Sequence, residues 1–392
     1  MLIRALHDEG VEYIFGYPGG AALHIYDAIF RQQEIEHILV RHEQAATHMA
    51  DGYARATGRP GVVLVTSGPG ATNAITGIAT AYMDSIPIVV ISGQVPNAQI
   101  GTDAFQETDM VGISRPVVKH SFLVKTAAEI PDVVKKAFYI AASGRPGPVV
   151  IDVPKDTTDP NETYAYEYPA EVSLRSYKPA SVGHTGQIGI AMRALREARR
   201  PVIYTGGGVV QGNASEELVA VAKKLGFPVT NTLMGLGAFP GDDPQFLGML
   251  GMHGTYEANC AMHHADLIFA IGARFDDRVT NNPAKFCPQA RIIHVDVDPA
   301  SIAKIIDVDI PIVGDCKVVL GEFLTALEAE MKDTPSEEGR IVEWWQRIQQ
   351  WRDEHGLDHD QSERRGAAGS LLPQQVVQAV YRATEGDAYV FQ

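Results

Sequence analysis

The chain has 392 residues, of which 33 are Lys or Arg and 48 are Asp or Glu, so its formal net charge at pH 7 is −15. A charge of this sign excludes the class of proteins that bind nucleic acid through a basic surface. Hydrophobic residues make up 45% of the chain, enough for the cores of two or three domains, which excludes an intrinsically disordered protein.

The cysteine content and the start of the chain bear on localisation. Cys260, Cys287 and Cys316 are an odd number at wide spacing, without a CxxC pair, which predicts reduced thiols. No signal peptide, transit segment or apolar run of about 18 residues is present. We therefore expect a cytoplasmic protein with neither a membrane nor a nucleic acid as partner.

The first part of the chain alternates short runs rich in Val and Ile with segments of helical periodicity, which is typical of buried parallel strands with crossover helices. The expected strands are 12–15, 37–40, 61–66, 87–92 and 148–154, and the Ala-rich segments 43–57 and 70–84 are expected helices. This pattern predicts a doubly wound α/β domain over residues 1–160. A linker follows, because residues 157–183 are rich in Pro, Tyr, Glu and Ser without clear periodicity.

A second α/β domain is expected over residues 184–331. Its expected strands are 201–206, 266–272, 291–298 and 309–314, and its last helix is 315–331. Residues 332–371 are interpreted as a connector that carries a helix at 342–351. A helix at 372–384 and a strand at 387–392 would begin a third domain, and because two elements cannot form a core, we expect that domain to be cut off at its start.

Two glycine-containing motifs and one acidic residue carry candidate chemistry in the first domain. FGYPGG (15–20) lets the backbone turn sharply after a strand, and TSGPGATN (66–73) places free N–H groups where a strand passes into a helix. TSGPGATN lacks the lysine of a P-loop. Glu43, in RHEQAATHMADG (41–52), stands where a strand ends and a helix begins, a position also explained by compensation of the helix dipole.

Neither domain shows a metal-binding pattern. His42 and His48 do not share a helical face, so we expect structural histidines and no metal ligands. In the second domain, YTGGGVVQG (204–212) resembles a dinucleotide turn but lacks the acidic residue that completes the Rossmann fingerprint. Asp296 and Asp298 follow a strand, where a ribose hydroxyl or a helix N-terminus is a more common partner than a metal.

Taken in order, the motifs resemble those of one family, the large catalytic subunit of acetolactate synthase (acetohydroxyacid synthase). The resemblance runs from Leu2 to Gln392. RHEQAA and TSGPGATN are typical of the thiamine-diphosphate enzyme superfamily, and AFQE (104–107) with RFDDRVT (274–280) narrows it to the biosynthetic acetolactate synthases. The other motifs that carry it are SGQV (92–95), SGRPGPVVIDVPKD (143–156), MGLGAFP (234–240) and GMLGMHGTYEAN (248–259).

The resemblance implies a thiamine-diphosphate pyrimidine domain, a Rossmann-like central domain that binds FAD, and a third domain that holds the diphosphate through Mg²⁺. Glu43 matches the family's catalytic glutamate, which hydrogen-bonds the pyrimidine ring and activates the cofactor. The other residues matched to the thiamine-diphosphate site are Pro18, Gly19, Pro69, Asn73 and Gln106. Those matched to the substrate channel are Gly20, Ala21, Phe105, Lys155 and Arg278.

The residues matched to the flavin are Arg145, Gly206, Gly207, Gly208, Met252, His253, Gly254, Thr255, Gly272, Ala273, Arg274, Asp296, Val297, Gly314 and Asp315. The implied reaction decarboxylates pyruvate and joins the two-carbon unit to a second pyruvate or to 2-ketobutyrate, the first common step of branched-chain amino acid biosynthesis. Implied partners are a second copy of the chain, as a homodimer or tetramer, and a regulatory small subunit.

Two alternatives stay open at this point. One is another thiamine-diphosphate carboligase or oxidase, although Glu43 disfavours glyoxylate carboligase and RFDDRVT disfavours the flavin-free enzymes. The other is a truncated, non-catalytic FAD-binding protein, because the superfamily's Gly-Asp-Gly motif for Mg²⁺ and diphosphate is not found in the sequence. We expect the chain by itself to be inactive.

Overall fold

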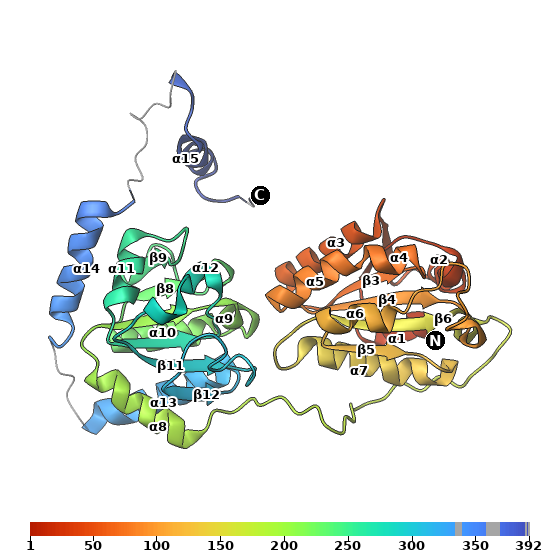
Figure 1. Ribbon diagram of the computed structural model, residues 1–392, viewed down its shortest axis with the longest axis horizontal. Helices are drawn as coiled ribbons and strands as arrows, with labels where there is room; N and C mark the ends of the chain where they lie inside the picture. The colour runs from red at the N-terminus through yellow and green to blue at the C-terminus, as the bar shows by residue number, and fades with distance from the viewer. Residues whose placement is uncertain (334–338, 358–368, 389, 391–392) are drawn as a thin grey trace. The chain divides into compact units, whose positions relative to one another are not determined.

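The computed structural model describes residues 1–333, 339–357, 369–388 and 390. It divides into two compact units, each described here by itself (Figure 1). The first comprises Met1–Gly183, Asp296–Ala300 and Val313–Val318, and the second comprises His184–Val295, Ser301–Ile312 and Val319–Gln392.

The first unit contains a parallel six-stranded sheet in the order β2-β1-β3-β4-β6-β5. Its strands are β1 (Tyr13–Gly16), β2 (Glu36–Leu39), β3 (Gly61–Val65), β4 (Ile88–Gln94), β5 (His120–Leu123) and β6 (Val149–Pro154). Its helices are α1 (Leu2–Asp8), α2 (Leu23–Phe30), α3 (Glu43–Thr57), α4 (Pro69–Asn73), α5 (Ile75–Asp84), α6 (Met110–Ser114) and α7 (Ile130–Ala142). The predicted doubly wound parallel sheet is confirmed, whereas β5 was not anticipated and the expected helix 70–84 is two helices.

Helices cover both faces of this sheet, because its central strands are apolar on both sides. Along β3, Val62 and Leu64 join the core that contains α1, α2 and α7, while Val63 and Val65 join the core that contains α3 and α5. Such two-sided burial is the reason that the strands read as continuous apolar runs in the sequence.

The strand order places a topological switch point between β1 and β3. From β1 the chain moves outward to β2 on one side and later continues through β3 and β4 on the other. In parallel sheets, ligands bind beyond the carboxyl ends of the strands at such a point. The motifs FGYPGG and TSGPGATN follow these two strands.

The second unit is built around another parallel six-stranded sheet, in the order β12-β11-β10-β7-β8-β9, with its switch point between β7 and β10. Its strands are β7 (Pro201–Thr205), β8 (Val229–Asn231), β9 (Phe246–Met249), β10 (Leu267–Ile271), β11 (Arg291–Asp296) and β12 (Ile310–Val313). Its helices include α8 (Thr185–Glu197), α9 (Gly207–Gln211), α10 (Ser215–Leu225), α11 (Tyr256–His264), α12 (Asp277–Thr280) and α13 (Cys316–Asp333). The sequence did not predict β8 and β9.

The predicted connector 332–371 contains a helix that belongs to the second unit, which differs from our interpretation. This helix, α14 (Val342–His355), buries Trp344, Ile348 and Trp351 in the core formed around β7 and β10. The Trp344 indole donates a hydrogen bond to the Pro201 carbonyl at 3.0 Å. The three residues recur at the spacing of one helical face, so α14 completes this core and is not a linker.

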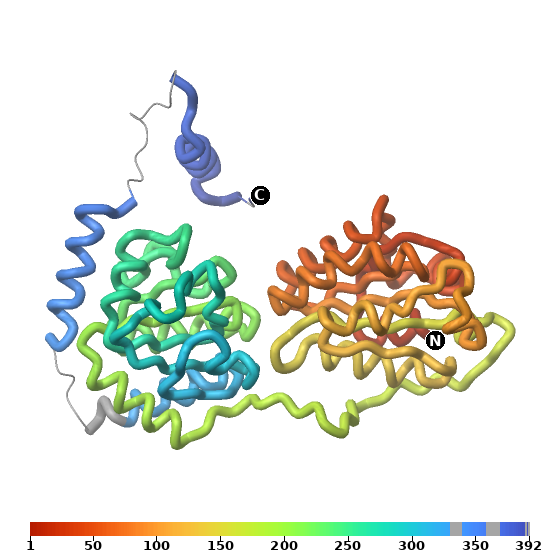
Figure 2. The backbone as a smooth tube through the Cα atoms, in the orientation of Figure 1, coloured from red at the N-terminus to blue at the C-terminus, as the bar shows by residue number. Residues whose placement is uncertain are grey.

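The expected linker 157–183 continues the first unit. After Thr158 it contains no helix or strand (Figure 2). Tyr166, Tyr168 and Tyr177 pack, partly buried, against the core of the first unit. The Tyr177 hydroxyl donates to the Ser143 carbonyl at 2.7 Å and accepts a bond from Lys119 Nζ at 2.9 Å. The tyrosines in this segment are therefore anchors on the domain surface.

The last described helix, α15 (Pro373–Thr384), matches the prediction for 372–384. Of the expected strand 387–392, residues 387, 388 and 390 are described and are not part of a strand, and the other three lie outside the described residues. No helix within the described ranges has the length and apolar character needed to cross a bilayer.

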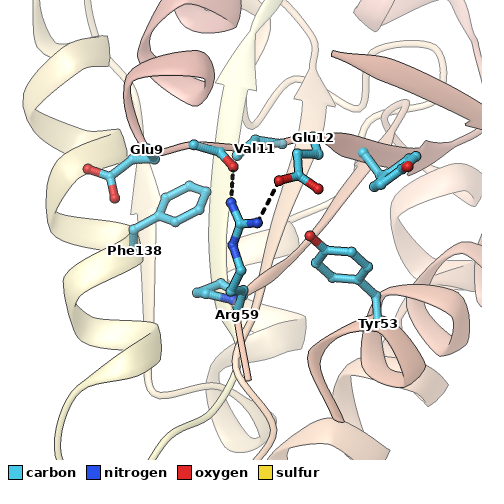
Figure 3. A pocket seen from close by; sticks show the side chains of 9 residues that line it. Glu9, Val11, Glu12, Tyr53, Arg59 and Phe138 are labelled. Atoms are coloured by element: carbon cyan, nitrogen blue, oxygen red, sulfur yellow. Dashed lines mark hydrogen bonds and ion pairs between the residues drawn. The ribbon is translucent and has the colours of Figure 1, made fainter. Parts of the chain in front are cut away.

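A shallow pocket lies where β1 begins, away from the switch point (Figure 3). The Arg59 side chain lies in it and donates to Glu12 Oε1 at 2.7 Å and to the Gly10 carbonyl. Because its cation is already engaged by these two groups, we interpret this pocket as a structural clamp.

Candidate functional site

Beyond the carboxyl ends of β1 and β3, two loops pack against each other through Thr66. The backbone N–H of Ala21 donates to Thr66 Oγ1 at 3.3 Å. A Cβ atom at Gly19 would lie 2.5 Å from Thr66 Cγ2, and one at Gly70 would lie 2.8 Å from the same atom. Gly19 is therefore required for the close approach of the two loops, and Gly70 is required for the tight turn of its own loop over Thr66.

The structure brings Glu43 and Asn73 together at this switch point. Glu43 is the first residue of α3, whose N-cap His42 accepts a bond from the Gln44 N–H through Nδ1 at 3.1 Å. Asn73 Nδ2, at the end of α4, donates to Glu43 Oε2 at 3.0 Å. The other oxygen, Oε1, lies 3.4 Å from the position that a Cβ at Gly70 would take. One carboxylate oxygen is thus held by an amide while the other faces the glycine turn.

Tyr26 lies behind this carboxylate. Its hydroxyl donates to the Leu64 carbonyl at 3.1 Å, and a Cβ at Gly16 would lie 2.7 Å from that hydroxyl. Burial first, and then the Glu43 carboxylate, raise the pKa of Tyr26 above its ordinary value. The Tyr26 hydroxyl therefore stays neutral and keeps its hydrogen bond to the Leu64 carbonyl.

The Gly-Pro-Gly turn meets the segment that carries Gln106. Gly68 has φ +57° and Gln106 has φ +58°, and a Cβ at Gly68 would lie only 2.5 Å from the Gln106 carbonyl oxygen. The neighbouring Phe105 side chain is 88% exposed. The structure therefore places Gln106 next to the turn that carries Pro69, as expected for two segments lining one site.

The end of β4 supports both sides of this site, and its residues belong to the motif SGQV (92–95), for which the sequence indicates no individual roles. A Cβ at Gly93 would lie 3.1 Å from Ala21 Cβ, while the buried Gln94 amide donates to the Thr108 carbonyl at 2.7 Å. Gln94 also donates to Asp152, a residue 2% exposed on β6. The signal was present in the sequence: polar residues interrupt the apolar runs PIVVISGQ and PVVIDVP.

The Asp152 carboxyl group is almost completely buried from solvent. Burial raises its pKa to about 6, against the opposing effect of hydrogen bonds from Ser92 and Gln94, and the nearby Asp109 adds to the rise. A buried polar cluster of this kind is costly to build and needs a structural or functional reason.

In the second unit, the expected flavin loops after β7 and β10 lie side by side. A Cβ at Gly206 would lie 2.3 Å from the Gly272 carbonyl oxygen, and one at Gly208 would lie 2.7 Å from Gly272 Cα. Ala273 contacts the same turn. The glycines of YTGGG are thus needed for loop packing at the switch point.

The expected flavin segment 252–255 is held by its neighbours. The Met252 N–H donates to the Arg278 carbonyl at 2.9 Å, and the Thr255 hydroxyl donates to Leu247 and caps α11. His253 and Gly254 form the turn between them. Met252 and the Arg278 side chain are both well exposed.

The remaining expected flavin residues lie at the ends of strands or just beyond them, except Arg145, which makes side-chain hydrogen bonds. The Gly314 N–H donates to the Asp296 carbonyl at 3.0 Å, and Asp315 caps α13 through the Lys317 N–H. Arg145 donates to Ser85 Oγ at 2.7 Å and to Asp298 Oδ2 at 3.3 Å, all within the first unit. Gly207, Arg274 and Val297 follow the ends of β7, β10 and β11, respectively.

Lys155 begins a short 3₁₀ turn after β6 and is half-buried. Pro18 and Gly20 are exposed on the loop after β1. Within the ranges that the structure describes, no group of three or more His, Cys, Asp or Glu side chains is arranged to hold a metal ion.

Comparison with known families agrees with this geometry. Residues 1–113 match the model described as "Thiamine pyrophosphate enzyme, N-terminal TPP binding domain", and residues 188–327 match "Thiamine pyrophosphate enzyme, central domain". The fold and the site together therefore define a thiamine pyrophosphate enzyme.

Comparison with individual relatives narrows the class of thiamine pyrophosphate enzymes to one family. Over 390 residues the chain is 61% identical to the acetolactate synthase large subunit of Haemophilus influenzae, and 58% identical to the acetolactate synthase isozyme 3 large subunit of Escherichia coli. Each match covers 100% of this chain and 67% of the relative. A probable acetolactate synthase large subunit of Methanocaldococcus jannaschii is 54% identical over 344 residues, which are 87% of this chain and 58% of the relative.

The chain belongs to the acetolactate synthase large-subunit family. It spans about two thirds of the length of the curated relatives that match it over 390 residues.

Proposed function

We propose that this chain forms the thiamine-binding and central parts of an acetolactate synthase that acts on pyruvate, with a second pyruvate or 2-ketobutyrate as acceptor. The observation that carries the proposal is the Glu43 carboxylate held by Asn73 at 3.0 Å, beyond the carboxyl ends of β1 and β3. The family membership of the whole chain supports it.

Thiamine diphosphate, when bound, supplies a carbon nucleophile and accepts the electrons released by decarboxylation. The residues fit its aminopyrimidine ring, because a Cβ at Gly70 would lie 3.4 Å from Glu43 Oε1, so the glycine keeps that side of the carboxylate free of a side chain. Glu43 would hold the pyrimidine ring and would exchange a proton through Oε1, while Asn73 keeps Oε2 in place. Pro18, Pro69 and Gln106 would complete the wall of this site.

The acid substrates need a cation. Lys155 and Arg278 are the proposed partners for the keto-acid carboxylate, and Gly20, Ala21 and the exposed Phe105 would line the approach.

FAD is proposed at the second switch point. The mutual packing of Gly206, Gly208 and Gly272 fits a dinucleotide, because such loops present backbone at the carboxyl ends of parallel strands. Mg²⁺ is proposed for the active enzyme as the counterion of the diphosphate, but we assign it no ligand among the described residues.

The proposed assembly is a homodimer or tetramer with a regulatory small subunit in the cytoplasm. The printed names of the relatives include the words "large subunit", which supports a smaller partner. Glu43 and Asn73 remain partly open to solvent in the single chain, and a second copy of the chain would exclude water from them.

Growth complementation tests this proposal. We would join residues 1–392 to the part of the Haemophilus influenzae relative that lies beyond its match, and express this chimera in a bacterium without acetolactate synthase. Growth without valine, leucine and isoleucine is the expected result. A soluble chimera that forms no acetolactate from pyruvate would overturn it, and another thiamine-diphosphate activity in the same protein would identify the alternative enzyme.

A further inference from the structure

Three buried polar side chains form a chain of hydrogen bonds across β4 and β6. Ser92 and Asp152 are paired residues in the ladder, and Gln94 lies two positions further along β4, on the same face. Ser92 Oγ donates to Asp152 Oδ1 at 2.6 Å, and Gln94 Nε2 donates to Asp152 Oδ2 at 3.0 Å. Ser92, Gln94 and Asp152 are at most 3% exposed.

Gln94 connects this cluster to the segment that carries Gln106. Its Nε2 group has two hydrogens, one directed to Asp152 and the other to the Thr108 carbonyl at 2.7 Å. Its Oε1 accepts the Val95 N–H at 2.8 Å, so the amide is used fully and its orientation is set. A carboxylate at position 152 can only accept hydrogen bonds, so the Gln94 amide must direct its NH₂ group toward Asp152.

The segment from Ala104 to Asp109 needs such an anchor. It contains no regular structure, and Gln106 has a positive φ of +58°, which is unfavourable for a residue with a side chain. The Glu107 carboxylate accepts the N–H groups of Gly101 and Ala104, which closes the loop on itself without attaching it to the sheet. The bond from Gln94 to Thr108 attaches it, two residues from Gln106.

We propose that Gln94, oriented by Asp152, is a positioning residue that holds the 104–109 segment so that Gln106 stays against Gly68 and faces the reacting end of the site. The inference rests on the proposed function for the role of Gln106. It gives a role to Gln94 and Asp152, which lie within the motifs SGQV and SGRPGPVVIDVPKD but have no role implied by those motifs.

Hydrogen exchange on the 392-residue chain tests the anchoring without any cofactor. Gln94→Met keeps the volume and removes both donors, and we expect amide exchange in residues 101–109 to quicken about tenfold or more. Ser92→Ala is the matched control, because it removes one bond to Asp152 and leaves the bond from Gln94 to Thr108. Equal exchange in this segment in the wild type and in Gln94→Met would overturn the proposal.

Two further variants keep the test decisive if Gln94→Met does not fold. Gln94→Asn retains an amide that is one methylene too short to reach both partners, so it should also free the segment. Asp152→Asn can donate to Ser92 and accept from Gln94, so it should leave exchange near the wild-type rate. The opposite ranking of these two variants would contradict a positioning role.

Kinetics in the chimera then separate positioning from general stability. Gln94→Asn should lower kcat about tenfold with KM for pyruvate changed less than threefold, while Ser92→Ala stays within twofold of the wild type in both. An unchanged kcat would show that Gln106 does not depend on Gln94. A wild-type chimera without acetolactate synthase activity would defeat the proposed function but leave the exchange result standing.

Discussion

Asn73 donates a hydrogen bond from Nδ2 to Glu43 Oε2 at 3.0 Å, across thirty positions of sequence and from the end of one helix to the start of another. This contact joins TSGPGATN to RHEQAA, the two motifs typical of the superfamily. The two carboxylate oxygens of Glu43 therefore have different surroundings: Oε2 accepts the hydrogen bond from Asn73, and Oε1 faces the Gly70 turn. The asparagine is therefore the residue that orients the carboxylate.

Replacing Asn73 by Asp should disturb that orientation. The donor becomes an acceptor, and a second negative charge would stand about 3 Å from Glu43, so we expect kcat/KM in the chimera to fall roughly tenfold to a hundredfold. Thr72→Ala, at the exposed neighbouring position, is the control and should keep full activity. Wild-type kcat/KM in Asn73→Asp would mean that Glu43 needs no orienting partner.

Gly70→Ala should destabilise the first unit by about 1–3 kcal/mol, because the added methyl group overlaps Thr66 Cγ2. Thr66→Ser removes that methyl group and keeps the hydroxyl that accepts the Ala21 N–H. In a double-mutant cycle measured by chemical denaturation, Thr66→Ser should recover most of the loss. Additive effects would show that the clash at Thr66 is not the cause.

The buried acid predicts a pH dependence of stability. Burial first, and to a lesser degree Asp109, raise the pKa of Asp152 from 3.8 to about 6. An acid with a raised folded-state pKa contributes stability below the unfolded-state pKa, and that contribution is lost as pH rises through the folded value. Relative to that of Asp152→Asn, the free energy of unfolding of the wild type should therefore fall by about 1.4 kcal/mol between about pH 5 and pH 8.

The measurement is the free energy of unfolding of both proteins in urea across that pH range. Ser92→Ala serves as a comparison, because it removes a bond and keeps the titrating group. A constant difference between wild type and Asp152→Asn would show that Asp152 does not titrate in this window.

Trp344→Ala should destabilise the second unit by about 3–5 kcal/mol, because the indole is 4% exposed and donates to the Pro201 carbonyl. Glu343→Ala, at the exposed neighbouring position, should change stability by less than about 0.5 kcal/mol. Urea unfolding of the chain followed by tryptophan fluorescence gives both numbers. Equal stability of the two variants would contradict the packing of α14 in the core. It would support our first interpretation, in which this helix belongs to a connector.

Part of this structure could be predicted from the sequence, for physical reasons that differ by element. Strands such as β3 and β7 are apolar on both faces, so their runs stand out, whereas β8 spans only Val229–Asn231 and carries little signal. The packing of α14 was missed because Trp344, Ile348 and Trp351 lie in a polar helix whose one apolar stripe is narrow. The 344/348/351 spacing was the available signal.

The motifs of the sequence point to the expected site residues and give no role to the residues that support them. Glu43 and Asn73 are placed together, as the superfamily motifs imply. Gln94 and Asp152 were missed because their interaction depends on the pairing of β4 with β6, which no local pattern shows. Polar residues inside strongly apolar strands were the available signal.

The role of Glu43 is the centre of this account, and the most direct test compares the wild-type chimera with Glu43→Gln in acetolactate formation from pyruvate at saturating thiamine diphosphate, Mg²⁺ and FAD. Glutamine keeps the volume and can still bond Asn73, but it cannot share a proton. We predict a loss of turnover of roughly 10²–10⁴-fold with the fold unchanged by circular dichroism. Turnover within a few-fold of the wild type would contradict the account and leave Glu43 as a carboxylate that only compensates the dipole of α3.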